Sequence, residues 1–285
     1  MTRLHPYVVK AMTAAEVGTA INWAAAEGWN PGLHDADCFL AADAGGFLMG
    51  FLDEEPVASI SVVRYGRSFA FLGLYIVKPE HRGHGHGIQL WNAGIELLGG
   101  RTVGLDGVVA QQDNYRKSGF VLAHRNVRYE GTASGSAAPR DENIVDLTQV
   151  PPAKLLAYDA PFFAEARDAF LDGWIRQPDA SALGYVSGGE LRGYGVVRAC
   201  RNGHKIGPLF ADSPDIAERL FMALQDRLPS GSALFIDPPA TNADAIALAQ
   251  RHGMVPVFET ARMYRGPAPR LALDRTYGIT TFELG

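Results

Sequence analysis

Two periodicities of apolar residues alternate along the first half of the chain. Helical spacing predicts a helix over residues 13–27, where Thr13 and Glu16 form a possible capping box. Runs rich in β-branched and aromatic residues predict strands after it, with a second helical run among them. These further elements are strands over 47–53, 56–65, 68–77 and 102–109 and a helix over 86–98. We therefore expect an α/β fold with a mixed sheet.

The second half of the chain repeats the pattern of the first. A strand that runs from a glycine through apolar residues to Arg, Tyr and Gly occurs in GFVLAHRNVRYEG (119–131) and again in GMVPVFETARMYRG (253–266). Nearly the same offset separates Leu90 from Leu220, Asp106 from Asp237, and Gly119 from Gly253. A near-constant offset indicates two copies of one fold.

The stretch between the copies has the composition of a linker. GTASGSAAPRDEN, residues 131–143, is poor in large apolar side chains and rich in Gly, Ser, Ala and charge. We therefore predict two tandem domains, residues 1–131 and 144–285, joined by a linker over 132–143.

Composition and charge narrow the classes of partner. The residues are 47% hydrophobic and 20% charged, which is ordinary for a globular protein, and a formal net charge of −5 gives no basic excess for nucleic acid or anionic membranes. Two cysteines, Cys38 and Cys200, suggest neither a disulfide framework nor a thiolate zinc site. The sequence lacks the long apolar run of a spanning helix, and its first residues are unlike a signal-peptide core, so we expect a cytoplasmic protein.

The candidate chemistry begins at HRGHGHG, residues 81–87, directly before the predicted helix over 86–98. A helix N-terminus carries unpaired N–H groups and partial positive charge, so a glycine loop entering it can wrap an anion such as phosphate. Gly83, Gly85 and Gly87 let the main chain approach such a ligand, and Arg82 can add charge-assisted hydrogen bonds.

Three other interpretations of this loop are open. His81, His84 and His86 could bind a metal, but no carboxylate or thiolate stands among them. A dinucleotide fold would place a ribose-binding acid where Asp106 ends the next strand, yet the spacing is GxGxG rather than GxGxxG, and residues 78–82 separate the strand from the first glycine. A loop that binds nothing would hold three alternating glycines at an entropic cost without use.

A family resemblance rests on two linked motifs. YIVKPEHRGHGHGIQLW closely resembles the acyl-CoA loop of the GNAT acetyltransferase superfamily, V-x-P-x-x-(R/Q)-x-x-G-x-(G/A). The matching residues are Val77, Pro79, Arg82, Gly85 and Gly87, followed at the usual distance by Tyr115 to Phe120, which match Y-x-x-x-G-F. The two-copy layout resembles tandem GNAT proteins with a YitH/HolE-type C-terminal domain.

The resemblance implies an acetyl-CoA site in the first copy. Main-chain amides of the loop would bind the pyrophosphate, and the backbone of the preceding strand would pair with the pantetheine arm. The implied cofactor-binding residues are Ile76, Val77, Arg82, Gly83, His84, Gly85, His86, Gly87 and Ile88. An amide near Ile76 would also serve as oxyanion partner of the thioester.

The resemblance further implies roles in catalysis. Tyr115 would protonate the leaving thiolate as general acid, unless it is simply a core tyrosine packed on the helix behind it. Many family members carry a glutamate on the strand before the loop, but FAFLGLYIV contains no acid, so the base is open among Asp106, His34 and Asp35. Asp106 is the first candidate for the base. The expected acceptor-binding residues are Trp29, Asn30, His34, Asp35 and Tyr75.

The second copy lacks the loop. The corresponding residues, 211–217, read ADSPDIA and contain no glycine. Asp212, Ser213 and Pro214 predict a helix start whose N–H groups are satisfied by its own side chains, and two aspartates would repel a pyrophosphate. We expect a degenerate second domain that serves as a wall or acceptor-site partner, with a tail, 271–285, that could reach back across the interface.

Together these observations predict an N-acetyltransferase that uses acetyl-CoA as co-substrate and no metal. The acceptor would be a primary amine of a small molecule or side chain, attacked within a ternary complex, and the protein would be a monomer or homodimer. An acyl-CoA-binding sensor without chemistry is an alternative, favoured by the missing glutamate. A dinucleotide-dependent oxidoreductase is a further one, and it requires NAD binding that depends on Asp106.

Overall fold

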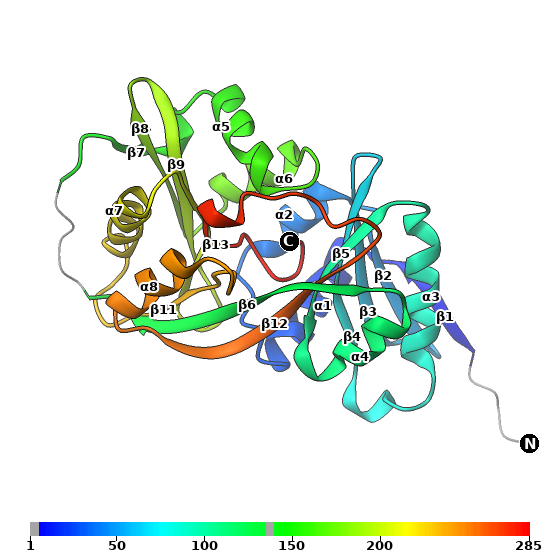
Figure 1. Cartoon of the computed structure of the whole chain (residues 1–285). Helices are drawn as coiled ribbons and strands as arrows, with labels where there is room; N and C mark the ends of the chain where they lie inside the picture. The colour runs from blue at the N-terminus through cyan, green and yellow to red at the C-terminus, as the bar shows by residue number, and fades with distance from the viewer. Residues whose placement is uncertain (1–5, 135–139) are drawn as a thin grey trace, which may run out of the picture.

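The computed structural model describes residues 6–134 and 140–285, so residues 135–139 of the predicted linker lie outside it. The described chain forms one 13-stranded sheet with helices packed on both faces (Figure 1). The predicted α/β fold with a mixed sheet is confirmed.

The first copy follows the predicted order of elements. The Thr13–Glu16 capping box is present, with the Glu16 side chain accepting from the Thr13 amide at 2.7 Å. Its helices are α1 (Ala14–Ala26), α2 (Asp35–Ala42), α3 (His86–Leu98) and α4 (Gln112–Lys117). Its strands are β1 (Tyr7–Ala11), β2 (Phe47–Leu52), β3 (Glu55–Tyr65), β4 (Phe69–Val77), β5 (Thr102–Val108) and β6 (Val121–Thr132).

The second copy repeats this order, which confirms the predicted duplication. Its helices are α5 (Pro152–Asp159), α6 (Asp168–Arg176), α7 (Pro214–Gln225) and α8 (Ala243–Arg251). Its strands are β7 (Ile144–Asp146), β8 (Ala180–Ser187), β9 (Glu190–Ala199), β10 (His204–Ala211), β11 (Ala233–Ile236) and β12 (Val255–Arg265). A short extra strand, β13 (Thr276–Gly278), follows it. In each copy the strand before the third helix pairs in parallel with the strand after that helix. These pairs are β4 with β5, on either side of α3, and β10 with β11, on either side of α7.

The two copies exchange their last strands. The sheet order is β1-β2-β3-β4-β5-β12-β6-β11-β10-β9-β8-β7, so β12 of the second copy pairs with β5 and β6 of the first copy pairs with β11. Between them β6 and β12 form a long antiparallel pair that joins the two halves (Figure 1). A boundary at residue 131 therefore divides the chain without dividing the sheet. The division into a catalytic and a degenerate domain stays a prediction.

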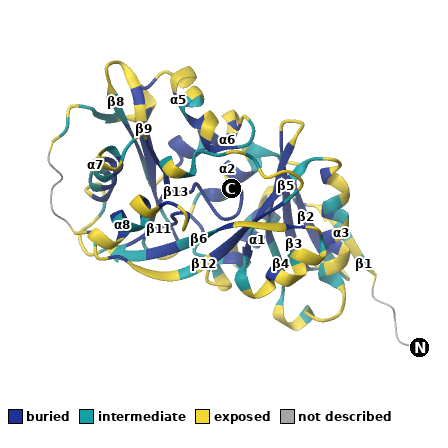
Figure 2. Ribbon diagram, in the orientation of Figure 1, coloured by how far each residue is buried: buried dark blue, intermediate teal, exposed yellow. Residues whose placement is uncertain are grey.

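A shared core lies between the two copies. The largest apolar cluster joins Phe39 on α2 to Trp174 on α6 and to Leu284 near the end of the chain, all of them almost fully buried (Figure 2). Burying a large apolar side chain stabilises a fold by about 1.5–3 kcal/mol. The copies therefore form one folded body, and the residues after β13 belong to its core.

Candidate active site

The site begins where two parallel strands of the first copy separate. β4 and β5 pair from Phe69 with Thr102 as far as Leu72 with Leu105, and beyond that point no pairing between them is recorded in the described chain. A bulge in the β3–β4 register follows, with Leu74 at a φ of 44° and its carbonyl accepting from the Ser59 hydroxyl at 2.7 Å. We call the opening between β4 and β5 the first V.

The glycine loop lies at the end of β4. A 3₁₀ turn over Pro79–His81 leads into it, and α3 begins at His86 with Gly85 as its N-cap. Gly83 and Gly85 both have φ +81°, and a Cβ added at either would meet no atom of the described chain within 4 Å. This backbone leaves the N-terminal amides of α3 uncovered, as anion binding at a helix N-terminus requires.

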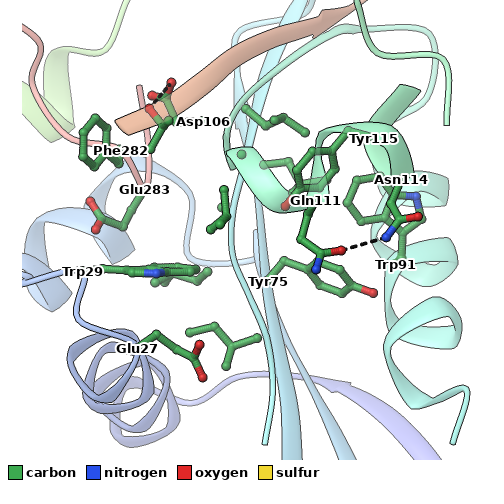
Figure 3. A pocket seen from close by; sticks show the side chains of 18 of the residues that line it. Glu27, Trp29, Tyr75, Trp91, Asp106, Gln111, Asn114, Tyr115, Phe282 and Glu283 are labelled. Atoms are coloured by element: carbon green, nitrogen blue, oxygen red, sulfur yellow. Dashed lines mark hydrogen bonds between the residues drawn. The ribbon is translucent and has the colours of Figure 1, made fainter. Parts of the chain in front are cut away.

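A cleft of about 600 Å³ passes through the first V. Figure 3 shows Tyr75, Tyr115 and Gln111 on one side of the central strands and Trp29, Glu27 and Glu283 on the other. The lining residues that the sequence predicted as functional are Trp29, Tyr75, Ile76, Val77, Arg82, Ile88, Asp106 and Tyr115. The rest of the predicted loop, Gly83, His84, Gly85, His86 and Gly87, forms the turn and first helical residues between Arg82 and Ile88.

Side chains of the loop are held by their surroundings. Arg82 donates from Nε to the Val77 carbonyl at 2.8 Å and forms an ion pair with Glu27 at the end of α1. The His86 ring stacks on Tyr7 with centroids 4.7 Å apart, and burial lowers the pKa of His86. The neutral form of the His86 ring is thus favoured.

Tyr115 is both packed and accessible from the cleft. Its ring stacks on Trp91 of α3 at 5.9 Å and covers Gly107, where a Cβ would lie 2.2 Å from the ring. Burial raises the pKa of Tyr115 to about 12, so the phenol keeps its proton at neutral pH. The packed tyrosine is therefore present at the cleft, and the general-acid role of Tyr115 stays a prediction.

Asp106 lines the cleft with both oxygens already engaged. Arg262 on β12 donates to it from Nε at 3.0 Å and from Nη2 at 2.6 Å. Asn126 adds a bond at 2.8 Å and Thr260 one at 3.3 Å. The pair is buried and joins the exchanged strand to β5, so a structural role is sufficient to explain the carboxylate.

The other predicted acceptor residues lie against the second copy instead of the cleft. Asn30 exchanges hydrogen bonds with the backbone of Asn202 at 2.8 and 2.9 Å. His34 contacts Asp179 at 3.0 Å. Asp35 is fully buried and pairs with Arg198 at 2.9 Å. These three residues hold the copies together, and the structure does not bring them to the cleft.

The cleft also has lining residues that the sequence did not predict, among them Glu27, Phe258, Phe282 and Glu283. Glu27 is the C-cap of α1, and Phe258 lies on β12, which reaches the site through the strand exchange. Phe282 and Glu283 follow β13. Their positions depend on pairing between distant segments, and no local pattern signals it.

A relative decides the family. The chain is 32% identical over 263 residues to a protein of Pseudoalteromonas sp. (strain SANK 73390) named holothin acyltransferase, covering 92% of this chain and 89% of that one. A GNAT acetyltransferase family model matches residues 15–120 and a GNAT acetyltransferase domain model matches residues 155–278. The chain belongs to the GNAT acetyltransferase family. Both copies are thus GNAT domains, and the protein is a tandem GNAT acyltransferase by family.

Solved structures share the tandem GNAT fold. A Pyrococcus horikoshii protein described as an acetyltransferase superimposes with a TM-score of 0.83 at 24% identity, over 100% of this chain and 99% of that one. A tandem GNAT protein from the clavulanic acid biosynthesis pathway gives a TM-score of 0.64 at 13% identity, over 92% and 100%. At these identities the likeness concerns the fold alone.

In the second GNAT domain, the opening that corresponds to the first V is closed by a further strand. Beyond Ile206 and Ile236, where the recorded pairing of β10 and β11 ends, β13 pairs with β10 through Gly278 and Leu209. We call this opening the second V. At the start of α7 the Ser213 hydroxyl accepts from the Ile216 amide at 3.4 Å, so this helix caps itself as the sequence predicted.

Two further findings concern metals and membranes. Within residues 6–134 and 140–285, no group of three or more His, Cys, Asp or Glu side chains is placed to hold a metal ion. His84 and His86 stack with centroids 6.1 Å apart. Among the helices of the described ranges, none has the length and apolar character that a bilayer crossing demands.

Proposed function

We propose that the protein transfers an acetyl group from acetyl-CoA to a primary amine in the cleft of its first GNAT domain. The observation that carries this is the contrast of the two V openings: the first is open, ends at an uncapped glycine loop and contains the cleft. The relative named for acyl transfer to holothin supports acyl transfer as the reaction.

The residues of the first V suit the proposed co-substrate. The amides between Arg82 and Gly87 would take the pyrophosphate at the N-terminus of α3. The backbone at Ile76 and Val77 would pair with the pantetheine arm and polarise the thioester carbonyl. The amine nitrogen then attacks the carbonyl carbon, the new C–N bond forms and the C–S bond breaks within one ternary complex.

Tyr115 would assist departure of the sulfur. Because its pKa is raised to about 12 by burial, the phenol is protonated throughout the neutral range and can donate to the developing thiolate. The proton shed by the nitrogen balances the one that the thiol gains. Replacing Tyr115 by Phe should lower kcat by about 10-fold or more while leaving acetyl-CoA affinity within about twofold.

Calorimetric titration with acetyl-CoA tests the proposal. The native chain should bind one acetyl-CoA, with NAD and zinc as negative controls. Gly85→Glu places a carboxylate where the pyrophosphate would lie and should abolish binding. Gly231→Glu is the matched control, because Gly231 also has φ +81° and no atom of the described chain within 4 Å of an added Cβ.

Three results would overturn the proposal. These are no binding of acetyl-CoA by the folded native chain, equal loss of binding in the Gly85 and Gly231 variants, and binding of NAD in place of acetyl-CoA.

A further inference from the structure

The residues from 276 to 285, called here the closing segment, connect the two V openings. Every one of them is buried. The segment leaves β10 at Gly278 and reaches β4, where the Glu283 carbonyl would lie 2.1 Å from a Cβ added to Gly73. Only a glycine at position 73 therefore lets this backbone lie over β4 just beyond the last β4–β5 pair.

The closing segment places an under-satisfied carboxylate in the cleft. Glu283 is 2% exposed and lines the cleft, and its Oε2 accepts from the Thr281 hydroxyl. Its Oε1 has no hydrogen-bond partner among the described residues. A buried polar atom without a partner is costly, so the unpaired carboxylate oxygen of a residue that lines the cavity suits a ligand that donates to it.

Glu283 lies on the opposite side of the central strands from Tyr115, the residue proposed to protonate the thiolate. In Figure 3 its side chain lies with Trp29 and Phe282 on one side of the central strands, and Tyr115 lies on the other. In the proposed reaction the thioester lies between them in the first V. An acceptor that enters on the Glu283 side would meet the carbonyl carbon from the face away from Tyr115.

The walls beside Glu283 are aromatic. Trp29, Phe258 and Phe282 line this part of the cleft, and the Arg128 guanidinium lies over the Phe282 ring at 4.7 Å. Arg128 is itself bound by Asp237 at 2.7 and 2.8 Å. Such walls favour an apolar or aromatic body, with a single cationic group at the carboxylate.

Charged side chains from three strands lie near Glu283. Two buried guanidinium groups interact with its charge, Arg128 on β6 and Arg198 on β9. Their ion-pair partners are Asp237 and Asp35, and Lys205 on β10 lies in the same cluster. Glu283 thus lies beside a cluster of three basic and two acidic side chains.

From these contacts we infer that Glu283, delivered by the second GNAT domain, binds the ammonium group of an apolar or aromatic primary amine and takes its proton. This inference rests on the proposed function and adds its base and its acceptor class. The ammonium gives one proton to Glu283 and becomes the neutral amine that attacks. The proton that the nitrogen sheds after attack matches the one that the thiolate receives, and Glu283 returns its proton to solvent.

Acetyl transfer by the full chain tests this role. The probe acceptors are 2-phenylethylamine and hexylamine, with spermidine as the polar comparison. Glu283→Gln should lower kcat/KM for the apolar amines by about 100-fold at neutral pH, with acetyl-CoA affinity within about twofold of native. The deficit should shrink as pH approaches the pKa of the amine, since a neutral amine needs no base. Glu283→Asp should restore part of the rate.

A matched carboxylate controls for charge loss beside the site. Glu259 follows Phe258 on β12 and pairs at the surface with Arg125, so Glu259→Gln should leave kcat/KM unchanged. A thermal unfolding midpoint close to native shows that each variant is folded. If Glu283→Gln lowers the midpoint severely, Thr281→Val, which frees Oε2 and keeps the carboxylate, should retain the native shape of the pH profile.

The outcomes separate this inference from the proposed function. Glu283 has no such role if folded Glu283→Gln stays within about twofold of native, or if its deficit is the same at every pH. Binding of acetyl-CoA without acetylation of either apolar amine also overturns the inference and leaves the proposed function standing. Failure to bind acetyl-CoA overturns the proposed function itself.

Discussion

In both GNAT domains a glycine on the strand before the V lies beneath the closing segment. A Cβ on Gly73 would meet the Glu283 carbonyl at 2.1 Å, and one on Gly207 would meet the carbonyls of Ile279 and Thr280 at 2.7 Å. In the second V the segment pairs with β10 as β13 and fills the opening. In the first V it forms one wall and leaves a cleft of about 600 Å³.

The segments that precede α3 and α7 also differ: the first is open and the second is capped by side chains. Gly83 and Gly85 present open backbone before α3, whereas Ser213 caps α7 and Asp212 is bonded to Tyr158 and Arg275. Duplication therefore did not give two equal sites. The second domain fills its own V, and the same segment then contributes side chains to the first.

The largest expected effect is a loss of stability on replacing the tyrosine in the second V, compared with replacing a tyrosine in the first V. Tyr277 in β13 is 1% exposed, so Tyr277→Ala should lower the free energy of unfolding by about 3 kcal/mol or more, with little change in acetyl-CoA affinity. Tyr75 is partly buried in the cleft. Tyr75→Ala should lower the free energy of unfolding by about half as much as Tyr277→Ala and should weaken acetyl-CoA binding. Urea unfolding and calorimetry measure both; equal stability losses would contradict the closed-versus-open comparison.

An intermediate effect is expected at the two glycines. Gly207→Ala and Gly73→Ala should each cost about 1–3 kcal/mol, because the added methyl group displaces the closing segment. Gly207→Ala should leave the acetylation rate per mole of folded protein nearly unchanged. Gly73→Ala should lower that rate, because the added methyl group moves Glu283. Gly100→Ala is the control, since its added Cβ meets no atom of the described chain within 4 Å. Equal loss of rate in both V variants would show that the closing segment acts as one unit.

The smallest effect concerns the exchanged strand pair that joins the domains. His124 on β6 pairs in register with Arg262 on β12, and burial, reinforced by Arg262, lowers the pKa of His124 to about 4. Because the unfolded chain binds a proton near pH 6.5 and the folded chain does not, stability should fall as pH drops from about 6.5 toward 4.

Between pH 6.5 and pH 5, protonation linked to His124 should lower the free energy of unfolding of the native chain by about 1–2 kcal/mol. His124→Leu should remove this part of the pH dependence. Urea unfolding at the two pH values measures it. An identical slope in the variant would contradict the lowered pKa of His124 in the folded protein.

The sequence predicted features that depend on neighbouring residues. The capping box at Thr13, the helix over 86–98 and the self-capped start at Ser213 each need side chains within a few positions. The duplication was visible because both copies keep a similar strand near Gly119 and Gly253.

The features that the sequence did not predict depend on distant pairing. β6 and β12 are similar strands, and either could lie beside β5, so pattern alone does not distinguish the exchange from two separate sheets. Asp35 reads as an acceptor residue until its partner Arg198 is seen, 163 residues away. Glu283 stands in a tail without a motif, and its role follows only from the path of the closing segment over Gly73.

Hydrogen exchange of the native chain with and without acetyl-CoA tests whether only the first V binds the co-substrate. We expect slower exchange over residues 76–88 on binding and no change over residues 209–217, because the ligand enters the first V alone. Protection over 209–217, or equal protection of both loops, would contradict it.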